Sequence, residues 1–404
     1  MNKKVFGLVT LLALSMTGCY IKEEFEEHEQ EEAKEEKQDQ KSCASGTFST
    51  GSTDDLMIAK VSKPICDPEC IAVKNIADMC GAISEPVTKN SGLILSGDFI
   101  FWETRQDGMG FGLTSTSQTL TLPHSLSVTQ HELDTQWKPG FRVDIGYIFG
   151  QHDSWDTMVE WTHFTPTEKT RFEKSGVKLI PTWGGGILGE SATSAEVTRK
   201  IRYNIGDIEL GRHYFTGKAL SVRPHAGLRF AQIKQHYQAD YSGAHFNLAN
   251  KDEETSFEAN NNFKGIGLRS GAHGTWHFYK NVGLLAKVSG SLLVGSFDIE
   301  QTWNGFQDQT TPPTPIPTVS NYSENLKRVR ANFETQLGLT LTHSFKNGNW
   351  VRLFFGYDSV HWFDQNMLVN NAFTGDTTQT LQAPVRRAGN LGTHGGTAKI
   401  EVKF

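Results

Sequence analysis

Charged side chains alternate with apolar ones along many segments between residues 91 and 404. Arg142 and Asp144, for example, are separated by Val143 and flanked by further apolar residues. Alternation with a period of two predicts a β-strand with one polar and one apolar face. Such a polar face is often only the wet side of a strand, but inside a closed barrel it lines the lumen. The residues that this pattern directs toward a lumen are Asp98, Arg142, Asp144, Glu160, Arg223, Arg229, Arg269, Arg328, Arg330, Glu334, Arg352 and Asp358.

Motifs for catalysis or cofactor binding are weak in this chain. The glycine-rich residues 108–112 and 184–186 are not followed by Lys-Ser/Thr, so we interpret them as loop tips and not as phosphate-binding loops. His131-Glu132 lacks the second histidine of a metalloprotease helix, and no Gly-x-Ser-x-Gly elbow occurs. We therefore expect no enzyme activity, no cofactor and no metal. Scattered residues from which a barrel hydrolase could still build a triad are His225, Ser289 and Asp358.

The first nineteen residues resemble an export signal. Two lysines precede an apolar run that is too short to span a bilayer, and Met16-Thr17-Gly18-Cys19 is similar to the box at which bacterial lipoproteins are cleaved and lipidated. We expect Cys19 to carry lipid; the alternative is ordinary signal cleavage nearby. Residues 1–19 are thus predicted to be a signal with a lipobox.

Residues 20–90 are predicted to form an acidic extension in the periplasm, irregular or partly helical. Residues 22–41 hold ten acidic side chains against four lysines, a net charge of −6 that equals the charge of the whole chain. Such a run is a solvated tether and disfavours nucleic acid as a partner. The remaining cysteines also lie here, and in an exported protein four cysteines favour disulfides, with zinc ligation by the Cys-x₃-Cys pair as the alternative. They are Cys43, Cys66, Cys70 and Cys80.

Residues 91–404 are predicted to form an all-β, up-and-down antiparallel barrel that crosses an outer membrane. Most alternating segments reach the roughly 9–11 residues that a tilted strand needs to cross the hydrocarbon layer. Near Gly206 the apolar face changes parity, which predicts a β-bulge. The ten predicted strands are centred on residues 93–102, 141–149, 155–162, 201–210, 220–230, 266–278, 282–294, 328–341, 351–358 and 397–404.

Short and long connections alternate between these strands. Residues 151–154, 216–218, 280–281 and 346–349 are short, whereas the intervening connections are long. Outer-membrane barrels have short periplasmic turns and long external loops, and an even strand count places both termini inside. An extended stretch at residues 120–128 would raise the count to twelve. The proline-rich residues 311–317 predict a stiff loop tip, either a spacer or a cell-surface contact.

The last strand ends on an aromatic residue. Ala398, Ile400, Val402 and Phe404 alternate with charged or polar residues. The pattern by itself fits either an edge strand of a soluble domain or the closing strand of a membrane barrel with Phe404 at the interface.

Six motifs in the barrel region, taken in order, resemble the pore-forming major outer-membrane proteins of Legionella and the chlamydia-like bacteria. The resemblance extends from about Ser96 to Phe404 and implies an outer-membrane porin for small hydrophilic solutes or ions. It also implies that the barrel-assembly machinery recognises the last strand, so we expect Phe404 to be part of the assembly signal. The other expected partners are membrane lipid, small solutes, and further copies or disulfide-linked envelope proteins. The alternative is a surface adhesin or structural barrel without an open pore. The motifs are GDFIFW (97–102), WKPGFRV (137–143), DSWD (153–156), DIELGR (207–212), LSVRPHAGLR (220–229) and HWFDQN (361–366).

Overall fold

The structure is a computed structural model, and strands are the regular elements of the part that it describes. That part comprises residues 91–115, 128–150, 155–174, 177, 179–183, 192–216, 219–243, 254–308, 315–370 and 385–404. Among these residues no helix could cross a bilayer. Cys19, Cys43, Cys66, Cys70, Cys80 and the acidic run lie outside the described residues, as do residues 311–314 of the proline-rich stretch.

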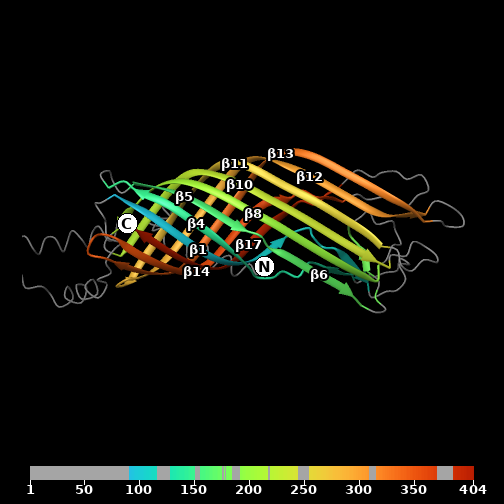
Figure 1. Cartoon of the computed structure of the whole chain (residues 1–404), viewed down its shortest axis with the longest axis horizontal. Coiled ribbons are helices and arrows are strands. Elements are labelled where there is room, and N and C mark those ends of the chain that lie inside the picture. Colours follow the sequence, from blue (N-terminus) through green and yellow to red (C-terminus); the bar gives the residue numbers. More distant parts are fainter. Residues whose placement is uncertain are drawn as a thin grey trace, which may run out of the picture. The chain divides into compact units, whose positions relative to one another are not determined.

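Ten antiparallel strands form a closed wall, which confirms the predicted barrel (Figure 1). The first and last of them, β1 and β17, pair with each other and close the wall, with Phe99 opposite Ala398. In the lipid-facing part, closure leaves no free sheet edge, as a β-structure in lipid requires. In order around the wall the strands are β1 (Gly92–Gln106), β4 (Lys138–Ile148), β5 (Trp155–Phe164), β8 (Ser194–Arg212), β10 (Leu220–Ser242), β11 (Glu254–Tyr279), β12 (Val282–Asp308), β13 (Pro315–Ser344), β14 (Trp350–Asn366) and β17 (Gly389–Lys403).

Seven short strands lie outside this ring. β2 (Gly112–Ser115), β3 (Val128–His131) and β7 (Leu179–Pro181) form a separate small sheet. The described residues thus give a wall of ten strands, and residues 120–127 of the stretch that could have raised the count lie outside them. β6 (Thr167–Glu173) continues β5 along β8 after an interruption at Pro166, which lacks an amide hydrogen. β9 (Tyr214–Thr216) pairs with β10. β15 (Val369–Asn370) pairs with β16 (Val385–Arg386).

Two of the short connections contain backbone in the left-handed region that tight turns use. Asn281, between β11 and β12, has a φ of 74°, and Gly348, between β13 and β14, has a φ of 86°. The Phe345 amide donates to the Asn349 carbonyl and closes the second turn at 2.8 Å. We call the end of the barrel that carries these connections the short-turn end; the C-terminus lies there too (Figure 1).

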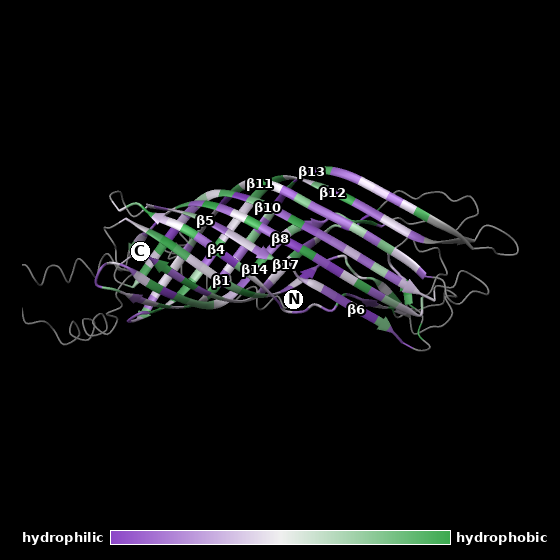
Figure 2. Ribbon diagram, viewed as in Figure 1, coloured by the Kyte–Doolittle hydropathy of each residue, from purple (hydrophilic) through white to green (hydrophobic). Residues whose placement is uncertain are grey.

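The outer face of the wall near the short-turn end carries exposed apolar side chains. Along each strand they alternate with buried polar residues, as Figure 2 shows by colour. A band of exposed large hydrophobics would be unfavourable in water and fits contact with lipid. It includes Leu95, Phe99, Val143, Ile145, Ile208, Leu210, Leu228, Ile266, Leu268, Leu292, Val294, Leu337, Leu339, Phe355 and Ile400.

The predicted β-bulge near Gly206 is wrong. β8 pairs with β5 and with β10 without any shift in register. Instead, polarity inverts on an unbroken strand: Tyr203 and Ile205 point inward and are 2% exposed, and Asp207 follows inward at 1%. Ile208, on the outer face, is 45% exposed. The parity of the apolar residues changes because the barrel interior changes from charged to apolar there, while the outside changes from lipid to water.

The same inversion occurs on the neighbouring strands at matching register. Gly206 lies opposite Phe230, Phe230 opposite Ile266, and Ile266 opposite Val294. The next outward row contains Asn204, Gln232, Lys264 and Ser296, which are polar. We call this boundary the inversion line. β10 to β13 continue well beyond it, and each is about twice as long as a membrane crossing requires.

Candidate functional site

Ion pairs fill the interior of the lipid-facing part of the barrel. Arg229 on β10 donates from Nε to Asp207 Oδ1 at 2.7 Å and from Nη2 to Asp207 Oδ2 at 2.6 Å, and it also pairs with Glu334. Arg269 on β11 donates to Glu334 Oε2 at 2.7 Å. The side chains of both arginines are 1% exposed or less. Because Glu334 is on β13, these bonds join strands that are not neighbours in the wall.

A second group of ion pairs surrounds Arg142 on β4. Its guanidinium lies 3.1 Å from Asp98 on β1, 3.3 Å from Glu160 on β5 and 3.4 Å from Asp358 on β14. Lys399 on β17 lies beside Asp98 and Asp144 in the same group. Positive side chains are therefore enclosed by carboxylates from several strands.

Lys287 on β12 pairs with the second group from across the lumen. Its Nζ lies 3.3 Å from Glu160 Oε2 on β5, a strand far from β12 around the wall. Burying such ions costs free energy that close partners offset, and removal of one partner typically costs about 3–5 kcal/mol. The network therefore closes the lumen and also braces the wall.

A cavity of about 130 Å³ lies between this network and the short-turn end. Its lining is mostly ionisable, and side chains from β5, β8, β10, β11, β12 and β17 contribute. They include Asp156, Glu209, Arg223, His273, Lys287 and Glu401. The cavity can hold water and small ions beside the charged side chains.

Beyond the inversion line the interior is mostly apolar, although buried polar groups such as the Arg199–Glu168 ion pair also lie there. Trp362 on β14 and Tyr203 on β8 meet there, and Phe263 packs against Phe297 with ring centroids 4.7 Å apart. Nearer the outer mouth, Trp183 stacks on Phe257 at 5.0 Å. These buried rings close the lumen a second time.

Part of this apolar closure comes from segments that are not in the wall. Phe111 and Trp183, next to β2 and β7, are buried among wall residues, as is Met367, next to β15. The Tyr241 hydroxyl on β10 donates to the Phe111 carbonyl at 2.7 Å. Burial raises the pKa of Tyr241 above its ordinary value, so this hydroxyl stays protonated and remains a donor at neutral pH.

Comparison with known proteins identifies the family. The sequence profile described as Legionella pneumophila major outer membrane protein precursor matches residues 87–404. The chain belongs to this family. Its place is therefore the outer membrane, as predicted. Barrels of this membrane typically carry their short turns on the periplasmic side. No curated protein sequence matches the chain.

Solved outer-membrane barrels show a distant similarity to this member of the family. Outer membrane protease OmpT from Escherichia coli shares 10% identity over 78% of this chain and 97% of its own, with a TM-score of 0.32. The Pseudomonas putida toluene transporter TodX shares 9% identity over 80% of this chain and 93% of its own, with a TM-score of 0.27.

The structure brings most residues that the sequence directs toward a lumen into these ion pairs. Asp98, Arg142, Asp144, Arg223, Arg229, Arg269 and Asp358 are buried, and Glu160, Glu334 and Arg352 are nearly so. Two arginines that were predicted to join the charged lining lie elsewhere. Arg330 is buried beside Met367 and the ring of Phe297 in the apolar part, and Arg328 is exposed.

The three scattered residues considered for a triad bond to different partners. His225 lies beside Glu209, Ser289 donates to Glu334, and Asp358 pairs with Arg142. The sequence analysis did not select Asp156, Asp207, Lys287 or Lys399 as lumen residues, although all four take part in ion pairs. The alternation pattern could have predicted Asp207 as a lumen residue. Asp207 and Glu209 are two residues apart on β8, so both side chains face the same side of the strand.

Proposed function

We propose that the protein is a narrow outer-membrane pore for small ions and other small hydrophilic solutes, closed in the arrangement described. The observation that carries the proposal is the charged interior of the lipid-facing part, with a water-sized cavity open to it. A barrel that serves only as an anchor can be filled with apolar side chains, which is often as stable as buried ion pairs or more so. A charged lining, in contrast, is favourable in a lumen that water enters, because water solvates the charged groups.

Opening requires changes at two levels. The ion pairs around Arg229 and Arg142 must separate or exchange partners, and the rings around Trp183 must leave the outer mouth. Ten strands enclose a narrow lumen, whereas wide aqueous channels have about 16–18. We therefore expect small and infrequent conductance steps with weak ion selectivity, because both signs of charge line the interior.

The second candidate is a sealed surface protein that acts through its external part. The burial of Arg229 and Arg269 and the apolar packing around Trp183 favour it, since both close the lumen. Either reading assigns no enzyme activity to the chain. We further propose that lipid surrounds the barrel, that the assembly machinery recognises the end at Phe404, and that Cys19 carries lipid.

Planar-bilayer recording of purified protein distinguishes the two candidates. Wild-type protein should give small, rare steps, and Trp183→Ala and Glu334→Gln should raise the open probability or step size, because each weakens one closure. Trp276→Ala is a matched control, since Trp276 is 48% exposed on the outer face. If folded wild type and both closure variants are all silent, the pore proposal is wrong and the sealed barrel remains.

A further inference from the structure

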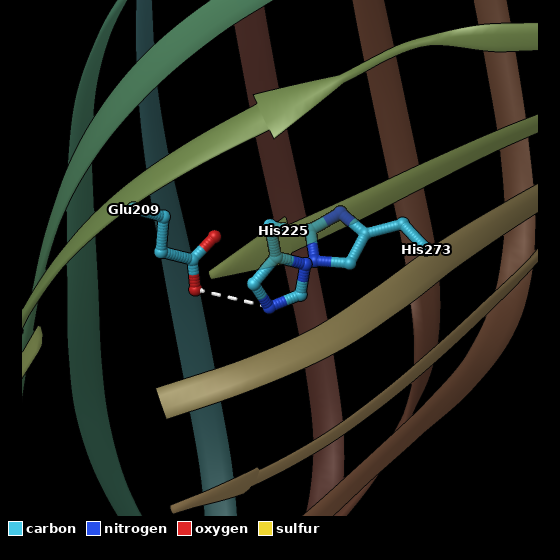
Figure 3. Close-up of side chains that lie close together, drawn as sticks. All are labelled: Glu209, His225 and His273. Carbon is cyan, nitrogen blue, oxygen red and sulfur yellow. Dashed lines mark ion pairs between the residues drawn. The ribbon is translucent and has the colours of Figure 1, made fainter. Parts of the chain in front are cut away.

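Three possible metal ligands meet inside the barrel. Glu209 on β8, His225 on β10 and His273 on β11 each offer one ligand atom, and these atoms all lie within 4.8 Å of one another (Figure 3). β8, β10 and β11 are consecutive in the wall, and the three side chains point to the same side of it. Two imidazoles and a carboxylate are the ligand set of several catalytic zinc sites.

Three of the four imidazole nitrogens of the two histidines lack a hydrogen-bond partner, which is unusual for buried polar groups. His225 Nδ1 and Nε2 and His273 Nε2 are buried without a partner, and the His225 side chain is 0% exposed. An unsatisfied buried donor or acceptor typically costs about 1–3 kcal/mol. The imidazole rings lie 4.7 Å apart and do not bond to each other. Free lone pairs in a fixed position are what a metal ion requires.

The spacing already suits a tetrahedral ion. His225 Nε2 lies 3.4 Å from Glu209 Oε1. Ligands bound at roughly 2.0–2.2 Å in tetrahedral geometry are themselves separated by about 3.4 Å. The ligand atom of His273 lies within 4.8 Å of the other two, so it has to move closer when an ion binds. The cavity at the periplasmic end is lined by Glu209 and His273, so it supplies a route for the ion and a place for a water ligand.

Nearby charges tolerate an added cation. Glu209 Oε1 accepts from Arg269 at 2.9 Å, and a metal ion on this oxygen would take the place of that bond. Arg269 keeps Glu334 at 2.7 Å and Asp207 at 3.5 Å as partners. Arg223 and Lys287 also approach the site, and the carboxylates of Asp156 and Glu160 face them.

We propose that Glu209, His225 and His273 form a site for a late first-row divalent cation of the Zn²⁺ type, loaded from the periplasm. Imidazole and carboxylate ligands favour such ions over Mg²⁺ or Ca²⁺. The bound ion would join β8, β10 and β11 inside the lumen and satisfy the free imidazole nitrogens. This site does not depend on whether the barrel conducts.

Co²⁺ titration of the folded full chain in detergent tests the site, because Co²⁺ follows Zn²⁺ chemistry and has visible absorption. The thiols are first alkylated, so that cysteine ligation does not contribute. Wild-type protein should bind one equivalent with a tetrahedral spectrum that lacks sulfur-to-cobalt charge transfer. The double variant His225→Gln/His273→Gln should lose that equivalent while His236→Gln, on the outer face of β10, keeps it.

The variants should fold, because three of the four substituted nitrogens make no hydrogen bond; the heat-dependent gel shift of closed barrels checks this. If the wild-type protein binds no Co²⁺ under these conditions, the proposal is wrong, whatever the variants do. Equal binding by wild type and the double variant overturns it as well, since the ion then lies elsewhere. Zn²⁺ should compete for the same equivalent, and failure to displace Co²⁺ would contradict the assigned ion class.

Discussion

Trp362 Nε1 donates a hydrogen bond to the Tyr203 hydroxyl at 3.2 Å, joining β14 to β8 on the opposite side of the barrel. Both side chains are buried at the boundary between the charged and the apolar interior. Like the cross-lumen ion pairs, this contact joins strands that are not neighbours in the wall, and it therefore braces the barrel.

Loss of this bond should destabilise the barrel by a measurable amount. Trp362→Phe and Tyr203→Phe should each cost about 1 kcal/mol for the bond, and Trp362→Phe more, because it also removes packing volume. Urea unfolding in lipid vesicles measures the change. The double variant should cost less than the sum of the single ones, whereas strict additivity would show that the bond contributes nothing.

Asp207→Asn should destabilise the protein by about 3–5 kcal/mol. It leaves the Arg229 guanidinium buried without its two-bond carboxylate partner. Asp298→Asn is the control, since Asp298 is exposed on the outer face of β12, and it should change the free energy of unfolding by less than about 0.5 kcal/mol. Similar effects of the two substitutions would contradict the bracing role of the ion pairs.

The inversion line can be tested on β8 alone. Ile208→Arg should cost about 2–4 kcal/mol if it faces the middle of the bilayer, and less if it lies near the headgroups. Arg202→Leu, on the same outer face but beyond the line, should leave stability within about 0.5 kcal/mol. A clear stabilisation by Arg202→Leu would place that residue in lipid and move the line outward.

Deletion of Phe404 should lower the amount of folded protein in cells more than the stability of protein folded in vitro. Phe404 is 59% exposed, and its amide donates to the Leu93 carbonyl at 2.9 Å. Removing one exposed aromatic costs only about 1–3 kcal/mol of burial. Heat-modifiable protein in outer-membrane fractions gives the first quantity and urea unfolding the second. Unchanged cellular levels would remove the assembly role.

Sequence alternation predicted the ten strands and most of the lumen residues, because lipid outside and polar groups inside impose a period of two. The prediction failed where the strands extend beyond the lipid, because the outer face is no longer apolar there. On β8 the apolar residues Tyr203 and Ile205 pack inside the barrel beyond the membrane, whereas the assumption of lipid outside would place apolar residues on the outer face. Cross-lumen partners such as Lys287 and Glu160 could not be predicted either, since pairing across a barrel depends on strand tilt and stagger, which the pattern does not contain.

The position of the inversion line also determines how far the protein reaches. β13 extends from Lys327, just beyond the line, back to Pro315. With a rise of about 3.3 Å per residue and a tilt of about 40°, that segment climbs roughly 30 Å above the hydrocarbon. This height is about equal to the thickness of the hydrocarbon core of the bilayer. The outer end of this strand therefore lies above the lipid headgroups. Large molecules such as antibodies, which a crowded glycolipid surface otherwise excludes from the membrane, can reach it there.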